Sequence, residues 1–277
     1  MSVVARFHTG KGRPPIQALL TLPVVEKDRT IVSDVYPTGD VPENLLKLYL
    51  HFSAPMRRTG VYEHIHLTDK HGERIEAPFV EVDPPLWDRE TRRLTLIFEP
   101  GRIKRGLRQH ADLGLSLAKN THFSLVVTPG MRDATGQTLD NSHVVRFSVI
   151  DADRRSPSTK DWVIRTPDAG THQPLVVELD ESLDHALLQS MIDVYDTTGF
   201  VEGTVALEDS ERVWHFTPRE PWREGTCELR INVLLEDLAG NRLDRLFDVD
   251  MMTTEEQTME DLGEWVTKRF SIQSGGR

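Results

Sequence analysis

Short runs of alternating apolar and polar residues recur along most of the chain. Clusters of Gly, Pro, Asp and Asn separate one run from the next. A period of two places successive side chains on opposite faces of a β-strand. Many short strands with turn signals between them are typical of a β-sandwich. The clearest predicted strands are Leu48 to Phe52, Leu94 to Phe98, Phe123 to Val127, Val144 to Ile150 and Leu175 to Leu179.

Two stretches share a turn pattern, in which Gly follows Asp by three positions and Leu follows Gly by three. They are Asp133-x-x-Gly136-x-x-Leu139 and Asp237-x-x-Gly240-x-x-Leu243. The Asp side chain can accept hydrogen bonds from nearby backbone N–H groups, and Gly supplies the positive φ that such a turn needs. Matching turns in the two halves of the chain predict an internal repeat.

Other positions match at a spacing that shrinks along the chain. Leu48 matches Leu175 and Ile65 matches Ile192, both at an offset of 127 residues. The offset falls to 118 for Phe98-x-Pro100 and Phe216-x-Pro218, and to 104 for the two Asp turns. Shorter loops in the second copy would reduce the offset in steps of this kind. The first repeat therefore has larger loops, which are expected around residues 82–92 and 106–120.

These matches divide the chain into five parts. Residues 31–150 form the first predicted domain and residues 161–250 the second, joined by a charged linker over residues 151–160. Residues 1–30 are a leader with one strand from Ile16 to Val25. Residues 251–277 are a C-terminal extension, with a helix expected over residues 255–262 and a strand from Trp265 to Ile272. A further short helical segment is expected between His185 and Met191.

The turn and strand-end motifs resemble bacterial Ig-like domains of the SbsA type. The residues that carry the resemblance in the first half are Leu50-x-Phe52-Ser53-x-Pro55-Met56, Ile65-x-Leu67-x-Asp69-x-x-Gly72, Phe98-x-Pro100 and Asp133-x-x-Gly136. The second half matches less completely, because Ser182-Leu183 replaces the Pro-Met pair. The resemblance implies an all-β chain of two tandem Ig-like β-sandwich domains with minor helical segments. It also implies a structural or binding module without catalytic residues, in a periplasmic or cell-surface setting.

The composition of the chain limits the kinds of partner that it can bind. A net charge of −11 argues against binding to nucleic acid or to anionic membranes. No apolar run is long enough for a transmembrane helix, and the N-terminus as written has no signal-peptide pattern. The single cysteine, Cys227, is expected to be a small buried strand residue. The compartment and oligomeric state stay open.

The enlarged loops hold the candidate binding residues. Arg102, Lys104, Arg105 and Arg108 form a basic run that could grip an anionic group, or could pair with the protein's own carboxylates. Trp87 could offer an aromatic platform to a sugar or peptide, or could plug the end of the sandwich. The expected partner is an unknown protein or glycan.

Two alternatives compete with a non-enzymatic module. His64 and His66, at i and i+2 of a strand, could help bind a metal in an exported protein, although no further ligand has a typical spacing. The Asp133 and Asp237 turns could likewise bind calcium rather than act as turns alone. A carboxylate-based hydrolase is the third hypothesis, but no nucleophile, zinc or phosphate-loop motif occurs. The sequence predicts no enzyme activity and no cofactor.

Overall fold

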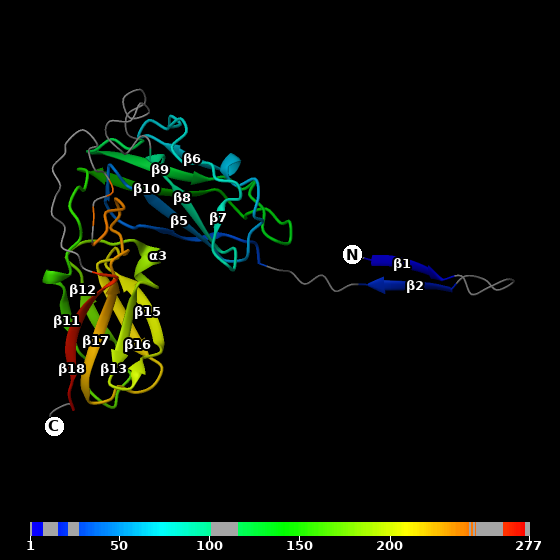
Figure 1. Cartoon of the computed structure of the whole chain (residues 1–277). Helices are drawn as coiled ribbons and strands as arrows, with labels where there is room; N and C mark the ends of the chain where they lie inside the picture. Colours follow the sequence, from blue (N-terminus) through cyan, green and yellow to red (C-terminus); the bar gives the residue numbers. More distant parts are fainter. Residues whose placement is uncertain are drawn as a thin grey trace.

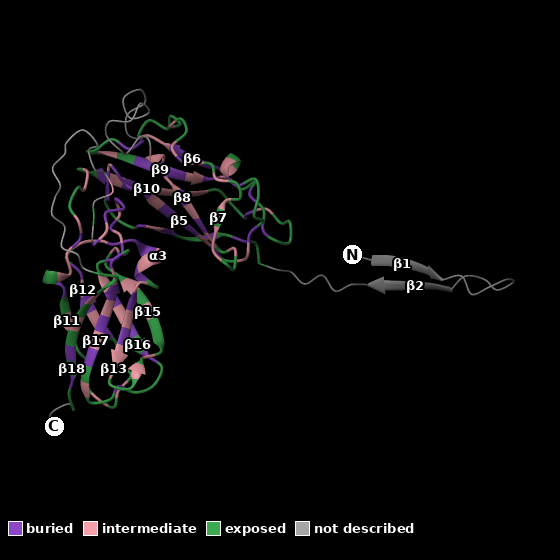
Figure 2. Cartoon of the chain, in the orientation of Figure 1, coloured by how far each residue is buried: buried purple, intermediate pink, exposed green. Residues whose placement is uncertain are grey.

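The computed structural model describes residues 2–7, 16–21, 28–100, 116–243, 245, 247 and 263–274. Strands dominate this part of the chain, and they build two β-sandwiches that meet near the short helix α3 (Figure 1). Along the strands of both sandwiches, buried positions alternate with half-buried or exposed ones (Figure 2), as expected when one face of each sheet is turned inward. The predicted all-β sandwich class is therefore confirmed.

The first sandwich packs two four-stranded sheets against each other. Their strand orders are β3-β5-β8-β7 and β4-β10-β9-β6. A single 3-10 turn, η1 (Tyr62–His64), precedes β6. The strands are β3 (Val32–Tyr36), β4 (Val41–Pro42), β5 (Lys47–Phe52), β6 (Ile65–Thr68), β7 (Leu86–Trp87), β8 (Arg93–Ile97), β9 (Thr121–Val127) and β10 (His143–Ile150).

The second sandwich also consists of two four-stranded sheets. Its sheets have the orders β11-β12-β16-β15 and β14-β13-β17-β18. The 3-10 turn η2 (Thr159–Asp161) leads into it, and α3 (His185–Leu188) is the single helical turn expected near His185. The strands are β11 (Val163–Arg165), β12 (Leu175–Glu178), β13 (Ile192–Asp196), β14 (Gly199–Phe200), β15 (Gly203–Glu208), β16 (Val213–Pro218), β17 (Gly225–Asn232) and β18 (Trp265–Ile272).

The structure differs from the sequence analysis at both ends of the chain. Strand β18 pairs with β17 along its whole length, so part of the predicted C-terminal extension belongs to the second sandwich. Residues 255–262, where a helix was expected, lie outside the described residues. In the leader, β1 (Ser2–Phe7) pairs antiparallel with β2 (Ile16–Thr21). One strand was predicted in this leader, from Ile16 to Val25, whereas the structure has two, and the second ends at Thr21.

Each sandwich has its own apolar core, formed by inward-facing residues of both sheets. Of the ten core residues predicted from the sequence, nine are buried. The exception is Val126, which is only half-buried, because Phe123, Leu125 and Val127 take the inward positions of β9. Cys227 is buried on β17, as expected. The predicted core residues are Leu50, Phe52, Leu96, Phe98, Val126, Val177, Leu179, Phe216, Ile231 and Val233.

The two Asp turns have the predicted geometry. Asp133 Oδ1 accepts hydrogen bonds from the backbone N–H groups of Thr135 (2.8 Å) and Gln137 (2.9 Å). Asp237 Oδ1 accepts the equivalent bonds from Ala239 (2.8 Å) and Asn241 (2.9 Å). Gly136 and Gly240 have φ values of +87° and +83°. The same local chemistry therefore forms the same turn in both sandwiches.

Candidate functional site

The main polar site lies where the two sandwiches meet, and Lys47 of β5 is at its centre. Its ammonium group contacts Asp184 (3.2 Å) and Glu236 (2.5 Å), both in the second sandwich. Asp184 is 4% exposed. Burial opposes the charge on Lys47, but the two carboxylates outweigh it and raise the pKa of Lys47 above its usual value. Lys47 therefore stays charged and links the sandwiches.

Asp184 joins this ion pair to the helical turn behind it. Its carboxylate accepts hydrogen bonds from the N–H groups of Ala186 and Leu187, both at 3.0 Å, which caps the start of α3. The Tyr49 hydroxyl of the first sandwich donates to the same carboxylate at 2.7 to 2.8 Å. Asp184 thus binds two N–H groups of its own sandwich and two side chains of the other, Tyr49 and Lys47.

Aromatic rings extend the contact beside Asp184. The Tyr36 ring stacks on the His185 imidazole with centroids 3.5 Å apart and an interplanar angle of 16°. His185 Nδ1 lies 3.2 Å from Glu211 Oε1. Burial, together with the charges of His185 and Arg93, lowers the pKa of the nearby His51. The His51 ring lies edge-on to Tyr36 and His185, with centroids 5.3 and 5.6 Å apart, so a neutral imidazole fits this aromatic contact.

The linker is held firmly against both sandwiches. Asn44 of the first sandwich donates to the backbone oxygen of Asp153 at 2.6 Å, and the Asp153 N–H donates to Asn44 Oδ1 at 2.9 Å. Asn241 of the second sandwich donates to the same Asp153 oxygen at 3.3 Å. The charged residues that predicted a linker over residues 151–160 therefore belong to an ordered junction.

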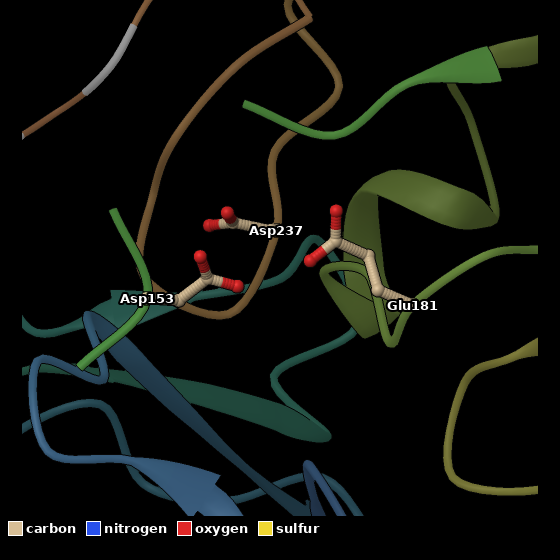
Figure 3. Close-up of side chains that lie close together, drawn as sticks. All are labelled: Asp153, Glu181 and Asp237. Atoms are coloured by element: carbon tan, nitrogen blue, oxygen red, sulfur yellow. The ribbon is translucent and has the colours of Figure 1, made fainter. Parts of the chain in front are cut away.

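Three carboxylates gather at this junction. Asp153 comes from the linker, Glu181 from the loop between β12 and α3, and Asp237 from the second Asp turn (Figure 3). Figure 3 shows their carboxyl groups pointing toward one another, and their nearest oxygens all lie within 4.8 Å. Asp153 and Glu181 also line a groove of about 730 Å³ between the sandwiches. Such a group can share protons or surround a hard cation.

The two Asp turns have the same local geometry, but the carboxyl groups of Asp237 and Asp133 have pKa values shifted in opposite directions. Burial raises the pKa of Asp237 to about 7, against its hydrogen bonds with Asn241, and the charge of Asp153 adds to the rise. In the first sandwich burial also opposes ionisation of Asp133, but hydrogen bonds from Thr135 and Thr30 prevail and lower its pKa. Two turns with one local geometry therefore carry carboxyl groups of different protonation.

We expect the junction to weaken as the pH rises from about 5 to about 8. Burial and Asp153 raise the pKa of Glu181 to about 8, so folded Glu181 and Asp237 keep protons that the unfolded chain has released. The free energy of unfolding then falls as the pH passes through these values. Asp153→Asn is expected to stabilise the protein by about 1 kcal/mol at pH 8 and to have little effect at pH 5. Urea unfolding at both pH values measures this, and equal effects at both would contradict it.

The structure describes only some of the candidate binding residues proposed from the sequence. Arg102, Lys104, Arg105 and Arg108 lie outside the described residues. Trp87 lies on β7, half-buried, with its ring centroid 5.7 Å from that of Phe52 and its Nε1 donating to the Arg58 oxygen at 3.3 Å.

The two histidines do not share the strand that the sequence predicted for them, because only His66 is a strand residue. His64 belongs to η1 rather than to the strand, and its Nδ1 lies 3.2 Å from Thr128 Oγ1. His66 is on β6, where burial, with Arg74 and His64 nearby, lowers its pKa. Within the described ranges, the one group of three close His, Cys, Asp or Glu side chains is Asp153, Glu181 and Asp237.

Sequence reasoning missed most of the junction. Asp237 was singled out as a turn residue, but Lys47, Asp184 and Glu181 carried no motif. Lys47 begins a run of alternating residues on β5, so the sequence pattern predicts an ordinary outward-facing strand residue at this position. A signal did exist for Asp184, because an Asp directly before the expected helical segment is a favourable N-cap. The contacts of Asp184 with the other sandwich form only in the folded protein, so no local sequence pattern predicts them.

Comparison with known proteins gives no family. No family model matches the chain, and no curated protein matches it. Among solved structures, the MG0-NIE-MG1 part of Escherichia coli alpha-2-macroglobulin has a TM-score of 0.29 at 10% identity, covering 74% of this chain and 66% of that one. The S-layer protein SbsC has 0.32 at 8%, covering 90% and 41%. Titin domains A164-A165 have 0.24 at 6%, covering 89% and 97%.

These likenesses carry no argument about function, because their TM-scores are low. The chain spans less than two thirds of the alpha-2-macroglobulin and SbsC structures. No helix among the described residues is long and apolar enough to cross a membrane. The chain is thus described by its own features: two all-β sandwiches joined through a buried ionic junction.

Proposed function

We propose that this protein is a non-enzymatic structural or binding module in which two copies of an Ig-like domain are held at a fixed angle. The observation that carries the proposal is the Lys47 network, in which the largely buried ammonium group of Lys47 binds two carboxylates of the other sandwich. A flexible pair of domains needs no such contact, since interfaces between independent domains are usually small and mobile. The junction fixes where each sandwich presents its outer loops.

Several contacts around Lys47 support the fixed arrangement. The Leu46 N–H donates to the Leu238 oxygen of the other sandwich at 2.9 Å, and the Leu238 side chain packs against the first core. The N–H of Thr38 donates to Glu211 Oε2 at 3.4 Å. Apolar, ionic and backbone contacts therefore occur together. Two copies of one domain are supported by the matching sheets β3-β5-β8-β7 and β11-β12-β16-β15 and by the matching runs β10-β9-β6 and β18-β17-β13, although the edge strands β4 and β14 differ.

Small-angle X-ray scattering of the full chain tests this proposal. A fixed module gives one particle shape that does not change with salt, because the Lys47 ion pair is largely buried and weakly screened. Two independently moving sandwiches give a scattering curve that only a broad set of arrangements reproduces. That second result would overturn the proposed function.

The grouped carboxylates favour a second candidate function, a carboxylate-based hydrolase. A Glu with a raised pKa beside a groove has the protonation of a general acid, and Glu181 has both features. Against this role, both Asp237 oxygens already accept hydrogen bonds within their own turn. Turnover of aryl glycosides by the wild type, lost in Glu181→Gln, would establish the hydrolase; no turnover by the wild type would remove it.

A further inference from the structure

Five exposed arginines surround one end of the first sandwich. They belong to three loops, over residues 55–60, 88–92 and 131–137. In Figure 1 the turn before β10 and the strand β7 mark this end, away from the junction with the second sandwich. The arginines are Arg57, Arg58, Arg89, Arg92 and Arg132.

Hydrogen bonds hold the three loops together. The N–H of Arg57 donates to the Arg132 oxygen at 3.0 Å, which joins the first loop to the third. The N–H of Met56 donates to the Thr91 oxygen at 2.9 Å, which joins the first loop to the second. The Trp87 indole nitrogen donates to the Arg58 oxygen at 3.3 Å. The arginines are therefore carried by one connected surface, which we call the arginine end.

These arginines have no ion-pair partners among the described residues. Two exposed arginines of the second sandwich, in contrast, are paired: Arg165 with Glu178 at 2.7 Å and Arg219 with Glu202 at 2.9 Å. The arginine end is therefore a positive region on an acidic protein.

The carboxylates within the three loops do not cancel this charge. Asp133 is buried, and donors from its own turn and from Thr30 occupy its oxygens. Asp88 Oδ1 accepts the backbone N–H groups of Arg92 and Arg93, at 2.8 and 3.1 Å. Both carboxylates serve the loop backbone, and the third, Glu90, is exposed, so the five arginines still leave the three loops with a net positive charge.

Arg92 and Arg132 donate to the backbone oxygens of Ser53 and Gly136. The guanidinium groups of Arg57, Arg58 and Arg89 make no hydrogen bond within the described residues and are available for an external anion.

We propose that the arginine end binds an acidic polysaccharide, whose carboxylate or sulfate groups pair with the arginines. This inference rests on the proposed function, because it assigns a ligand class to the binding module. Guanidinium groups form charge-assisted, often bidentate hydrogen bonds with such anions. The half-buried Trp87 lies among these loops and offers an aromatic surface to a sugar ring, as aromatic side chains do in many binding sites.

The charge distribution favours a polysaccharide over nucleic acid. Duplex DNA carries about one negative charge per 1.7 Å, and the acidic remainder of this protein repels so dense a polyanion. An acidic polysaccharide of one charge per sugar places its anions farther apart. That spacing suits arginines distributed over three loops.

Isothermal titration calorimetry of the full chain tests the proposal. The probes are polygalacturonate, which carries carboxylates, chondroitin sulfate, which also carries sulfates, and neutral dextran. The test variant is Arg57→Gln/Arg58→Gln/Arg89→Gln, because none of these three side chains makes a hydrogen bond within the described residues. The control, Arg165→Gln/Arg219→Gln/Arg269→Gln, changes the charge equally at exposed sites of the second sandwich.

We expect one or both acidic polysaccharides to bind the wild type and neutral dextran not to bind. The test variant is expected to bind about tenfold more weakly, and the control variant with unchanged affinity. Comparing the two acidic probes shows whether carboxylate or sulfate is preferred. Equal losses in both variants, no binding of either acidic probe, or tighter binding of a single-stranded oligonucleotide would each overturn the proposal. None of these results alters the scattering test, so failure of the ligand is distinguishable from failure of the fixed module.

Discussion

Replacing Lys47 with Met is expected to lower the free energy of unfolding by about 3 kcal/mol. The substitution keeps most of the apolar stem but removes the ammonium group that neutralises Asp184 and Glu236. Asp184 is nearly fully buried and cannot recover hydration, although the Tyr49 hydroxyl and two N–H groups still solvate it. Removing one partner of a buried ion pair is costly because the other charge stays buried.

Guanidinium unfolding of the wild type and Lys47→Met measures this effect. Lys119→Met is a matched control, because Lys119 also pairs with a carboxylate, Asp151, at 2.5 Å, but both side chains are more than half exposed. That variant is expected to change stability by less than about 0.5 kcal/mol. A loss below about 1 kcal/mol in Lys47→Met would show that the junction contributes little stability.

Gly240→Ala is expected to destabilise the protein by about 3 kcal/mol, and Gly136→Ala by about 1 kcal/mol. Both glycines have positive φ in equivalent turns, so the backbone strain of an added side chain is alike. A Cβ on Gly240 would lie 2.4 Å from the Leu46 side chain of the other sandwich, whereas a Cβ on Gly136 meets nothing within 4 Å. The difference between the two variants therefore measures the close packing at the junction.

Thermal and chemical unfolding of the two glycine variants provides the comparison. The sequence alone predicts a loss of roughly 1–3 kcal/mol for Gly240→Val, argued from the turn without any contact. The structure adds Leu46 and separates the two turns. Equal losses of unfolding free energy for Gly240→Ala and Gly136→Ala would mean that only backbone strain destabilises the variants. The Leu46 side chain would then move aside at little cost.

The features that the sequence predicted correctly are local ones. Alternating residues set the strands, and each Asp-x-x-Gly turn forms within a few residues, so both were recognisable without tertiary information. The misplaced Val126 shows where that reasoning fails. Leu125, Val126 and Val127 are consecutive apolar residues, so hydrophobicity does not reveal which of them face inward. Pairing with β6 and β10 sets the facing positions of β9.

The junction was not predictable because it joins residues distant in the sequence. Lys47 and Asp184 are 137 positions apart, and their contact depends on how the two sandwiches meet. The Asp turns make the same point, since Asp133 and Asp237 have identical local signals but opposite pKa shifts. Strand β18 was assigned to an extension because it follows its turn much later than β10 follows the first turn.

A distance measurement between the sandwiches tests the fixed junction most directly. Spin labels placed by Thr59→Cys and Thr204→Cys would occupy exposed positions of the first and second sandwich, while the buried Cys227 stays unlabelled. Pulsed electron paramagnetic resonance then gives the distribution of label distances. A single narrow distribution in the wild type, broadened by Lys47→Met, is the predicted result. A broad distribution in the wild type, unchanged by Lys47→Met, would contradict the fixed two-sandwich module.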